Sequence, residues 1–326
     1  MPANYEYPDP LPDLLQIVKA QLDTKVNRLS PYKVYSPDEI ANIVIQKCLN
    51  LLSDYLLYIF RAMLSLSIYY DPWREFTMVV LRKPEKPNYK TPKAYRPIAL
   101  LSTVAKVLMA IVAEDVSQLV EQHQLLPPTH FGGRPGRTTT DTIHYLVHCI
   151  KGTWQKNDLA SILFLDVEGA FPNAVTDRLL HNLRRRRIPA AYVTFVKQLL
   201  TGQHTKLKFN DFMLESINIL NRIGQGDPLS MILYVLYNAD LLEIPGDKEH
   251  ENSLEYVDDV ALVATEKDFN ETIQRLQHMM TKEDGGLQWS REHNSRFETS
   301  KSHQEKAFGP KIPQKIQRKP GLFQVL

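Results

Sequence analysis

The residues best suited to chemistry are two adjacent aspartates in an apolar setting. Asp258 and Asp259 interrupt the run Leu254–Ala264, which is otherwise rich in Val, Leu and Ala. Such a run predicts two buried strands around a tight turn that holds both carboxylates. Because burying a lone carboxylate is costly, neighbouring carboxylates at such a turn favour a bound cation. For this segment alone, a hairpin whose acidic turn faces water is an equally good interpretation.

A second apolar strand is predicted to end in an aspartate. Ser161–Phe171 is an apolar stretch interrupted by Asp166 and closed by a glycine turn. If the two strands lie side by side, Asp166 and Asp258 meet at neighbouring strand ends, with Asp259 beside them. These hard oxygen ligands suit Mg²⁺, which also binds substrate phosphates, and a pair of such ions serves in-line phosphoryl transfer. Glu168 lies beyond the bend and is expected to be a polar neighbour.

A glycine-flanked glutamine lies between these two segments in the sequence. Gly224 and Gly226 on either side of Gln225 allow the backbone to approach a ligand closely. Pro228, followed by apolar residues at helical spacing, predicts the start of a helix. The loop therefore fits a role in delivering Gln225 into a site, although a Gly-x-Gly pattern alone is more often a structural turn.

Taken together and in this order, these segments resemble the polymerase motifs of reverse transcriptases, most closely those of non-long-terminal-repeat retrotransposons. The resemblance runs from about Trp73 to Lys301, which is more than two-thirds of the chain. Three segments match the catalytic motifs: Asp166–Phe171, Gly224–Ser230 and Tyr256–Asp259. Three segments upstream of the first motif match the fingers and template-side segments: Thr77–Pro84, Tyr95–Leu101 and Phe131–Asp141.

The resemblance implies a set of metal ligands. Asp166, Asp258 and Asp259 would form the carboxylate set that binds metal, with Asp166 and Asp258 the foremost direct ligands and Asp259 after them, and the carbonyl of Val167 would add a further ligand. The implied cofactor is a pair of Mg²⁺ ions, for which Mn²⁺ can substitute. Lys301 resembles the lysine of a fourth motif that protonates the leaving pyrophosphate.

The resemblance also implies a set of nucleotide contacts. Phe171 corresponds to the bulky residue beneath the sugar that leaves no room for a 2′-hydroxyl, which implies DNA synthesis. A simple core aromatic is the alternative for this residue. Gln225 and Gly226 would touch the incoming nucleotide and its templating partner. Arg96 and Lys83 are candidates for the triphosphate, because guanidinium and ammonium groups both bind phosphate oxygens.

Two clusters of arginine admit a nucleic-acid role and a structural one. Arg134 and Arg137 lie in a Gly/Pro-rich loop suited to the template backbone, and the alternative is a solvated loop. The run Arg184–Arg187 is more simply the end of a helix whose dipole it complements, although salt-dependent backbone binding could use it.

Composition is compatible with this function without deciding it. The chain has 326 residues, 43% of them hydrophobic, so there is ample material for a core, and its net charge is +2. A polymerase could carry a larger net positive charge than this chain does, and here the positive charge is concentrated in a few clusters of basic residues. The two cysteines, Cys48 and Cys149, lack paired spacing, so neither a disulfide framework nor a zinc site is indicated and a reducing compartment is expected.

The sequence predicts an intracellular protein that does not associate with a membrane. Residues Met1–Pro10 have no charged lead followed by an apolar core, so a signal peptide is not indicated. The apolar stretch Leu49–Tyr70 contains Asp54 and Arg61, whose insertion into a bilayer would cost roughly 2.5–3.5 kcal/mol each. We therefore expect a soluble helix there.

The expected fold class is α+β, a right-hand polymerase fold whose palm is an antiparallel sheet backed by helices, with fingers beside it. Within the palm we expect helices up to Arg187, around Tyr192–Leu200 and over Phe269–Met280, and a hairpin over Thr205–Ile219. The predicted divisions are a helical leader (1–72), fingers (73–157), palm with interleaved fingers elements (158–300) and a basic, disordered tail (301–326).

The family's helical thumb is expected to be largely absent. After Lys301 the sequence Gly309–Pro313 and its basic surroundings are too short and too broken by proline for such a domain, and no endonuclease segment is visible. The chain therefore resembles a C-terminally truncated retroelement copy, whose missing parts other retroelement-encoded domains or polypeptides could supply.

Three functions fit the sequence. The favoured one is an RNA-directed DNA polymerase that uses an RNA template, a DNA primer and deoxynucleoside triphosphates. The second is a catalytically inactive remnant with at most nucleic-acid binding, and the third is an RNA-directed RNA polymerase, against which Phe171 argues. Two departures from the family pattern remove no ligand: Met231 follows Ser230 where proline is common, and His130 stands where glutamine is common.

Overall fold

The chain folds into two compact units, each built from two stretches of sequence. The computed structural model describes residues 5–12, 16–33, 38–167, 170–209, 212–219, 223–224, 226–247, 249–281 and 322–325. Unit 1 combines Met1–Leu125 with Phe171–Tyr234, and unit 2 combines Leu126–Ala170 with Val235–Leu326. Each unit contains a sheet and helices, which confirms the predicted α+β class. The divisions predicted at residues 72, 157 and 300 stay a prediction.

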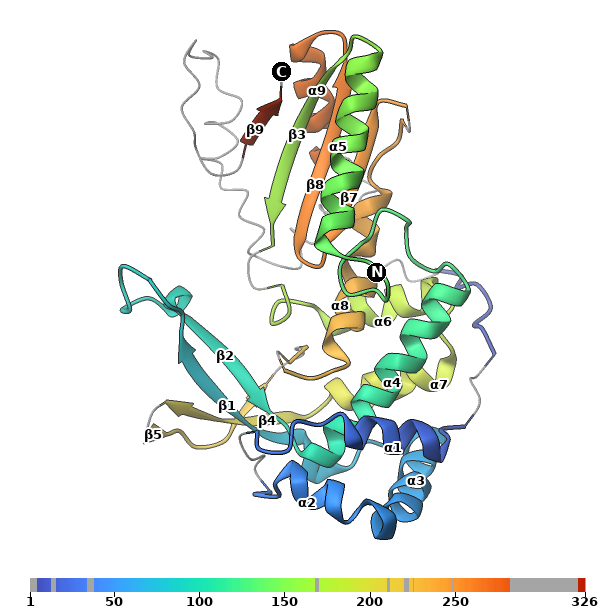
Figure 1. The fold of residues 1–326 in the computed structure, drawn as a ribbon, viewed down its shortest axis with the longest axis vertical. Coiled ribbons are helices and arrows are strands. Elements are labelled where there is room, and N and C mark those ends of the chain that lie inside the picture. Colours follow the sequence, from blue (N-terminus) through green and yellow to red (C-terminus); the bar gives the residue numbers. More distant parts are fainter. Residues whose placement is uncertain are drawn as a thin grey trace. The chain divides into compact units, whose positions relative to one another are not determined.

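The sheet of unit 2 is antiparallel and carries the aspartate segments. Its strands follow the order β7-β8-β3-β9, and their bounds are β7 Glu251–Tyr256, β8 Asp259–Glu266, β3 Leu159–Asp166 and β9 Leu322–Val325 (Figure 1). The predicted strand pair on either side of Asp258 is therefore confirmed, as is the apolar strand that ends at Asp166. The prediction that the two aspartate-bearing strands lie side by side is also confirmed, because β3 pairs directly with β8.

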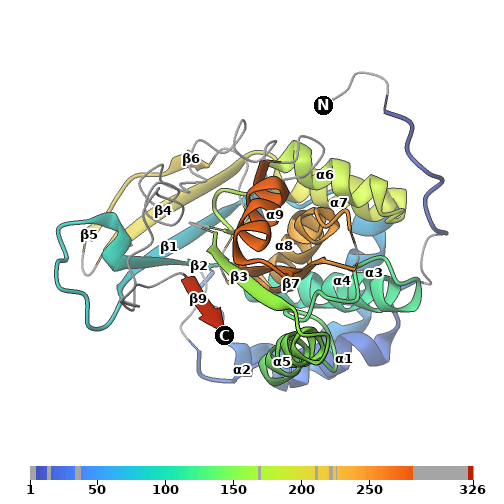
Figure 2. The same cartoon turned by 90° about the horizontal axis from the view of Figure 1, so that it is seen from above.

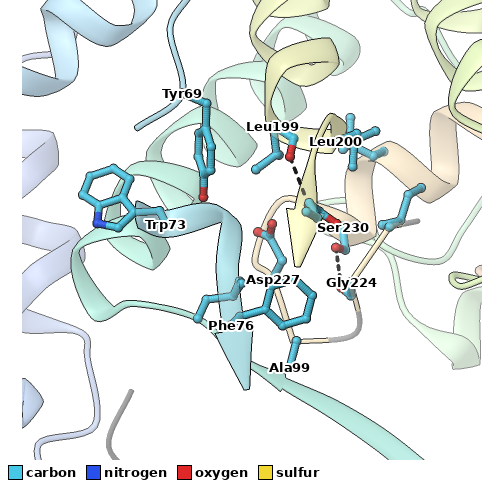
Figure 3. Close-up of a pocket in the computed structure, with 13 residues that line it drawn as sticks. Tyr69, Trp73, Phe76, Ala99, Leu199, Leu200, Gly224, Asp227 and Ser230 are labelled. Atoms are coloured by element: carbon cyan, nitrogen blue, oxygen red, sulfur yellow. Dashed lines mark hydrogen bonds between the residues drawn. The ribbon is translucent and has the colours of Figure 1, made fainter. Parts of the chain in front are cut away.

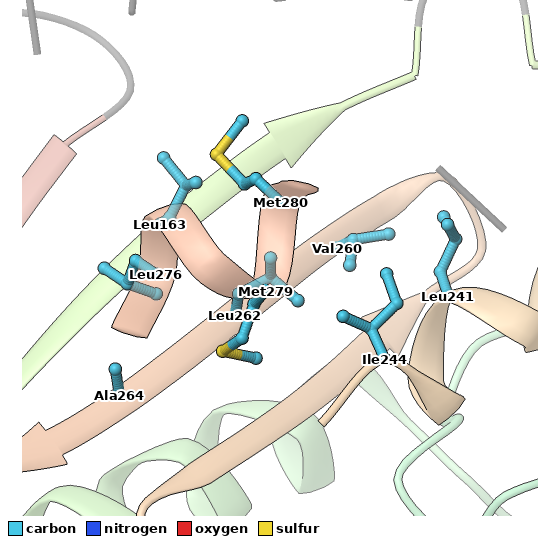
Figure 4. Packing of buried hydrophobic residues seen from close by; sticks show 9 residues of the cluster. All are labelled: Leu163, Leu241, Ile244, Val260, Leu262, Ala264, Leu276, Met279 and Met280. Carbon is cyan, nitrogen blue, oxygen red and sulfur yellow. The ribbon is translucent and has the colours of Figure 1, made fainter. Parts of the chain in front are cut away.

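Helices cover both faces of this sheet. On one face, α9 (Phe269–Thr281) contributes Leu276, Met279 and Met280 to a cluster with alternate residues of β8 and β3, as Figure 4 shows. The strand residues of this cluster are Leu163, Val260, Leu262 and Ala264, joined by Leu241 and Ile244. On the other face, α5 (Thr139–Gln155) packs on Ile162, Ala261 and Val263. The predicted helix from Phe269 and its packing are confirmed.

The sheet of unit 1 joins segments that are far apart in the sequence. Its order is β2-β1-β4-β5, and β6 lies beside β4 (Figure 2). The bounds are β1 Glu75–Arg82, β2 Tyr95–Leu100, β4 Gln203–Phe209, β5 Phe212–Met213 and β6 Ile217–Ile219. The hairpin predicted within the palm segment therefore joins the sheet of β1 and β2, and β4 runs parallel to β1.

The described helices of unit 1 are α1 Lys19–Asn27, α2 Asn42–Lys47, α3 Leu49–Ser65, α4 Thr103–Gln122, α6 Thr176–Arg185 and α7 Ala190–Leu200. The long helix α4 has largely buried apolar residues and packs against α1, while α3 packs against α1 and α7 and α6 packs against α7. Helix α8, Ser230–Asn238, begins in unit 1 and ends in unit 2. Three short 3₁₀ helices complete the described elements: η1 Asp71–Arg74, η2 Pro92–Ala94 and η3 Ala239–Glu243. Within the described part of the chain, no helix has the length and apolar character needed to cross a membrane.

The arginine run closes a helix, as its spacing indicates. Helix α6 ends at Arg185. The guanidinium of Arg184 lies over the ring of Tyr7, 5.7 Å from its centroid, and Arg187 Nε donates a 3.0 Å hydrogen bond to the carbonyl of Asp9. The run therefore ties the N-terminal segment to the end of α6.

The C-terminal part of the chain requires one correction. Leu322–Val325, predicted to lie in a disordered tail, form β9, which pairs antiparallel with residues 160–163 of β3. Three of these four residues are apolar, and the open edge of β3 offers their backbone a hydrogen-bonded partner. Residues 282–321, which include Lys301 and the segment Gly309–Pro313, whose prolines argue against a helical thumb, lie outside the described residues.

Candidate active site

A strained two-residue turn carries Asp258. The strands β7 and β8 pair up to Tyr256 opposite Asp259, which leaves Val257 and Asp258 as the whole connection. Val257 has a φ of +62°, a left-handed conformation that such hairpin turns demand and that β-branched residues rarely adopt. Its cost is of the order of 1–3 kcal/mol, so the surrounding structure must hold the turn in place.

The register of β3 and β8 gathers the three predicted aspartates. Asp166, the last residue of β3, lies directly opposite Asp259, the first residue of β8. Directly opposed residues in antiparallel strands have Cα atoms roughly 4.5–5.5 Å apart. Asp258 is half-buried, Asp259 is exposed, and the side chain of Asp166 lies outside the described residues.

The residues at these strand ends fit a divalent cation of the Mg²⁺ or Mn²⁺ type. Carboxylates on adjoining strand ends supply the hard oxygen donors that these ions prefer, and Val167, whose carbonyl is a predicted ligand, follows Asp166 directly in the chain. The described side chains, which do not include that of Asp166, contain no group of three or more His, Cys, Asp or Glu that could hold a metal ion. The ligand set therefore depends on Asp166 and stays a prediction.

The predicted template-side segment, Phe131–Asp141, packs against the backbone of the turn that carries Asp258. A Cβ atom added to Gly132 would lie 2.4 Å from the backbone nitrogen of Val257 and 2.8 Å from the carbonyl carbon of Tyr256. Only glycine permits this close approach. Gly132 is therefore one of the residues that hold the Asp258 turn, a role that sequence reasoning missed.

The two predicted template-binding arginines brace their own loop. Arg134 is buried, and its Nη1 donates hydrogen bonds to the carbonyls of Pro127 (2.9 Å) and His130 (3.1 Å). Arg137 Nη1 donates to the carbonyls of Pro128 and His130, the latter at 3.2 Å, and its guanidinium lies over the ring of Phe131. These contacts order the loop, and a template contact by either arginine stays a prediction.

Unit 1 contains the residues predicted to bind the nucleotide. Gly226 has a φ of +109°, and a Cβ added there would lie 2.9 Å from the carbonyl oxygen of Ala99 and 3.6 Å from Ile98 Cγ2. The loop of the second motif thus lies against β2. Arg96, two residues before Ile98, projects from the same face of that strand and is exposed. Gln225 itself lies outside the described residues.

Phe171 packs against an aromatic residue of α8. The rings of Phe171 and Tyr234 have centroids 4.8 Å apart and planes inclined by 32°, and Tyr234 is fully buried. Lys83 is half-buried, and its backbone N–H donates to the carbonyl of Ala94. Arg96, Phe171 and Gly226 thus belong to unit 1, whereas the aspartates belong to unit 2.

Asp227, the residue after the glycine loop, is a feature that sequence reasoning missed. Its Oδ1 accepts a 2.9 Å hydrogen bond from the backbone N–H of Leu229, one residue before α8. Figure 3 shows its carboxyl and the hydroxyl of Tyr69 turned towards the same small, mainly apolar pocket. Burial raises the pKa of Asp227 to about 6, against the opposing charge of Lys106. An Asp-Pro pair just before a helix was the signal that could have identified it.

Comparison with known proteins identifies the family. The family model described as reverse transcriptase (RNA-dependent DNA polymerase) matches residues 82–308, more than half of the chain. The chain belongs to the reverse transcriptase family. This match spans all three aspartates, and it confirms the resemblance drawn from the motifs.

Three relatives of the family come from Drosophila melanogaster. The chain is 28% identical to the probable RNA-directed DNA polymerase from transposon BS, over 70% of the chain and 25% of that protein. It is 28% identical to the corresponding protein of transposon X-element, over 66% of the chain and 23% of that protein. Identity to the RNA-directed DNA polymerase from mobile element jockey is 22%, over 88% of the chain and 31% of that protein. The chain thus spans about a quarter to a third of the length of these relatives.

Replacing Gly132 by alanine is expected to destabilise unit 2. The added methyl group would overlap the Tyr256–Val257 backbone, which cannot move aside without displacing the turn. We expect Gly132→Ala to lower the free energy of unfolding by about 1–3 kcal/mol, measured by urea titration.

Gly152→Ala is the matched control for this substitution. Gly152 lies in α5 of the same unit, and a Cβ there meets nothing within 4 Å. Alanine should raise stability by up to about 1 kcal/mol through its helix propensity. Equal tolerance of the two substitutions would contradict the close approach at Gly132.

The raised pKa of Asp227 predicts a pH-dependent stability difference. Because folded Asp227 binds its proton more tightly than the unfolded chain does, its contribution to the free energy of unfolding falls as pH rises from about 4 to about 6. Asp227→Asn keeps an oxygen for Leu229 N–H and stays neutral. Its stability relative to the natural chain should rise by about 1–3 kcal/mol between pH 4 and pH 7.

Urea titrations at several pH values measure this difference. Substitution of the exposed Asp177 of α6 by asparagine is the control, because it changes the same functional group in the same unit without removing the carboxyl of Asp227. If the stability difference between Asp227→Asn and the natural chain is the same at every pH, the pKa of Asp227 is not raised.

Proposed function

We propose that this chain is the polymerase domain of a retrotransposon reverse transcriptase, which extends a DNA primer on an RNA template with deoxynucleoside triphosphates. The observation that supports it most strongly is the register of β3 and β8, with Asp166 opposite Asp259 and Asp258 in the adjoining turn. An apolar sheet that ends in several carboxylates is costly unless a cation is bound there. Membership of the reverse transcriptase family supplies the reaction class.

In this proposal Asp166 and Asp258 hold two Mg²⁺ ions together with the carbonyl of Val167, and Asp259 lies beside them. When bound, such ions neutralise phosphate charge and activate the hydroxyl of the primer. Ligands on paired strand ends would be kept close to one another before metal binds, so little conformational entropy would be lost when they assemble.

Other residues of the chain position the substrates. Arg96, exposed on β2, offers a planar fork to the triphosphate, and Lys83 offers a point charge. Gly226 holds the loop of Gln225 against β2, so that the glutamine can contact the nucleotide and its template base. Lys301 would donate a proton to the leaving pyrophosphate.

Phe171 is proposed as the residue that selects deoxyribose. Its ring packs on the buried Tyr234, which limits the rotamers that Phe171 can adopt. A fixed aromatic wall beneath the sugar would exclude a 2′-hydroxyl by steric overlap. In this proposal Phe171 has both roles: its ring packs on the core residue Tyr234, and the same ring excludes ribonucleotides.

Domains and partners extend the same proposal. Residues 73–157 would serve as fingers and 158–300 as palm with interleaved fingers elements. RNA template, DNA primer and other retroelement-encoded domains would be the partners. Because the relatives are three to four times longer than the matched region, such domains can belong to the same polypeptide or to another.

Primer extension tests the proposed function. With poly(rA)/oligo(dT), dTTP and Mg²⁺, the natural chain should extend the primer, and Asp258→Ala should lower the rate by at least about 1,000-fold because a metal ligand is lost. Glu271→Ala, which removes an exposed carboxylate from α9, should leave the rate unchanged. No extension by the folded natural chain would instead favour an inactive remnant that at most binds nucleic acid.

Sugar selection tests the role of Phe171. Phe171→Ala opens space beneath the sugar, so we expect ribonucleotide incorporation to rise by at least about 10-fold relative to deoxynucleotide incorporation, the equivalent of roughly 1.4 kcal/mol of lost discrimination. Phe212→Ala, which removes an exposed aromatic from β5 of the same unit, is the control. Unchanged sugar selectivity in single-nucleotide incorporation assays would assign Phe171 to packing alone.

A further inference from the structure

A buried carboxylate lies three residues before Asp258 and is separate from the predicted metal ligands. Glu255 of β7 and His130 both have side chains with no exposed surface. Glu255 Oε2 lies 3.2 Å from His130 Nε2, and Glu255 Oε1 accepts a hydrogen bond from Asn238 Nδ2 at the end of α8. Partners on both oxygens offset the cost of burying this group.

The backbone around Glu255 is fixed by the same segment. Glu255 N donates a 3.1 Å hydrogen bond to the carbonyl of Thr129, and Phe131 N donates a 2.8 Å hydrogen bond to the carbonyl of Glu255. His130 and Glu255 thereby form a parallel bridge. Because β7 is the edge strand of its sheet, residues 129–131 act as a short additional strand that covers this edge.

The bridge leads directly to the strained turn. Gly132 follows the bridged residues and lies against the backbone of Tyr256 and Val257. A shift of residues 129–131 along β7 would therefore move Gly132 relative to the residue with positive φ that precedes Asp258. The carbonyl of His130 also accepts hydrogen bonds from Arg134 and Arg137, so the loop is fixed from both sides.

We propose that His130 and Glu255 are positioning residues, whose buried side-chain contact and backbone bridge hold the Val257–Asp258 turn in the conformation that binds metal. The inference rests on the proposed function, because it concerns the ligand Asp258. Neither residue touches the nucleotide or the metal; the pair acts through residues 129–132 and the backbone of β7. Glutamine at position 130 would keep a side-chain donor for Glu255, so His130→Gln should retain the function.

The test compares a variant that keeps the polar contact of the pair with variants that remove the polar contacts of Glu255. His130→Leu/Glu255→Met replaces both polar partners by apolar residues of similar size, a change that often leaves stability intact or raises it. His130→Gln is the conservative variant, and His144→Leu on the exposed face of α5 is the control in the same unit. Asn238→Ala removes only the second partner of Glu255.

Two measurements separate positioning from general stability. Hydrogen exchange followed by mass spectrometry compares a peptide that covers residues 254–262 with one from α9. Calorimetric titration measures the affinity for Mn²⁺, with Asp258→Ala as the reference for a lost site. Neither measurement requires polymerase activity.

We expect the double variant to exchange at least about 10-fold faster in the turn than in α9 and to bind Mn²⁺ at least about 10-fold more weakly. His130→Gln should stay within about threefold of the natural chain, and Asn238→Ala should change both readouts in the same direction by at least about threefold. Unchanged Mn²⁺ affinity, or exchange raised equally in α9, would overturn the proposal. If the double variant does not fold, the same criteria applied to Asn238→Ala decide the question.

If the proposed polymerase function is wrong, the Mn²⁺ titration gives a different result. In that case the natural chain and Asp258→Ala would both lack Mn²⁺ binding at this turn. The exchange comparison would still show whether His130 and Glu255 hold the turn.

Discussion

The structure depends above all on the antiparallel register between β3 and β8. Because side chains alternate between the two faces of a strand, this register places one set of apolar residues against α9 and the other against α5. A slip of one residue would turn Leu262, which is fully buried, towards the opposite face. The cores on both faces therefore fix the register, and the register places Asp166 opposite Asp259. Hydrophobic packing thus determines which backbone positions of β3 and β8 lie opposite one another at the aspartate end of the sheet.

The turn that carries Asp258 lies at the end of this sheet. The turn between β7 and β8 contains only Val257 and Asp258, and Val257 adopts a conformation that it would avoid in isolation. The segment around His130 supplies the compensation, through a backbone bridge to Glu255 and the close approach of Gly132. A strained turn braced by this bridged, buried segment explains how Asp258 can be held at a sheet end without a long supporting loop.

The sequence predicted the elements whose patterns are local and missed those set by distant partners. Apolar runs with a terminal aspartate predicted the strands of Asp166 and Asp258 correctly, and helical periodicity predicted α9. Sequence alone could not pair Glu255 with His130, because the two residues are distant in the chain and nothing in either segment specifies the other. The template contact predicted for Arg134 stays a prediction, but no composition rule reveals that its guanidinium binds the carbonyls of its own loop. The pairing of β9 with β3 was missed because its four residues follow a polar, proline-broken stretch.

Anomalous diffraction from Mn²⁺ tests the central claim most directly. Crystals of the natural chain soaked in MnCl₂ should show an anomalous peak coordinated by the carboxylates of Asp166 and Asp258, and crystals of Asp258→Ala should lose it. Ordered carboxylates at both positions without a peak between them, or a peak only elsewhere on the protein, would contradict the account that the β3–β8 register builds a metal site.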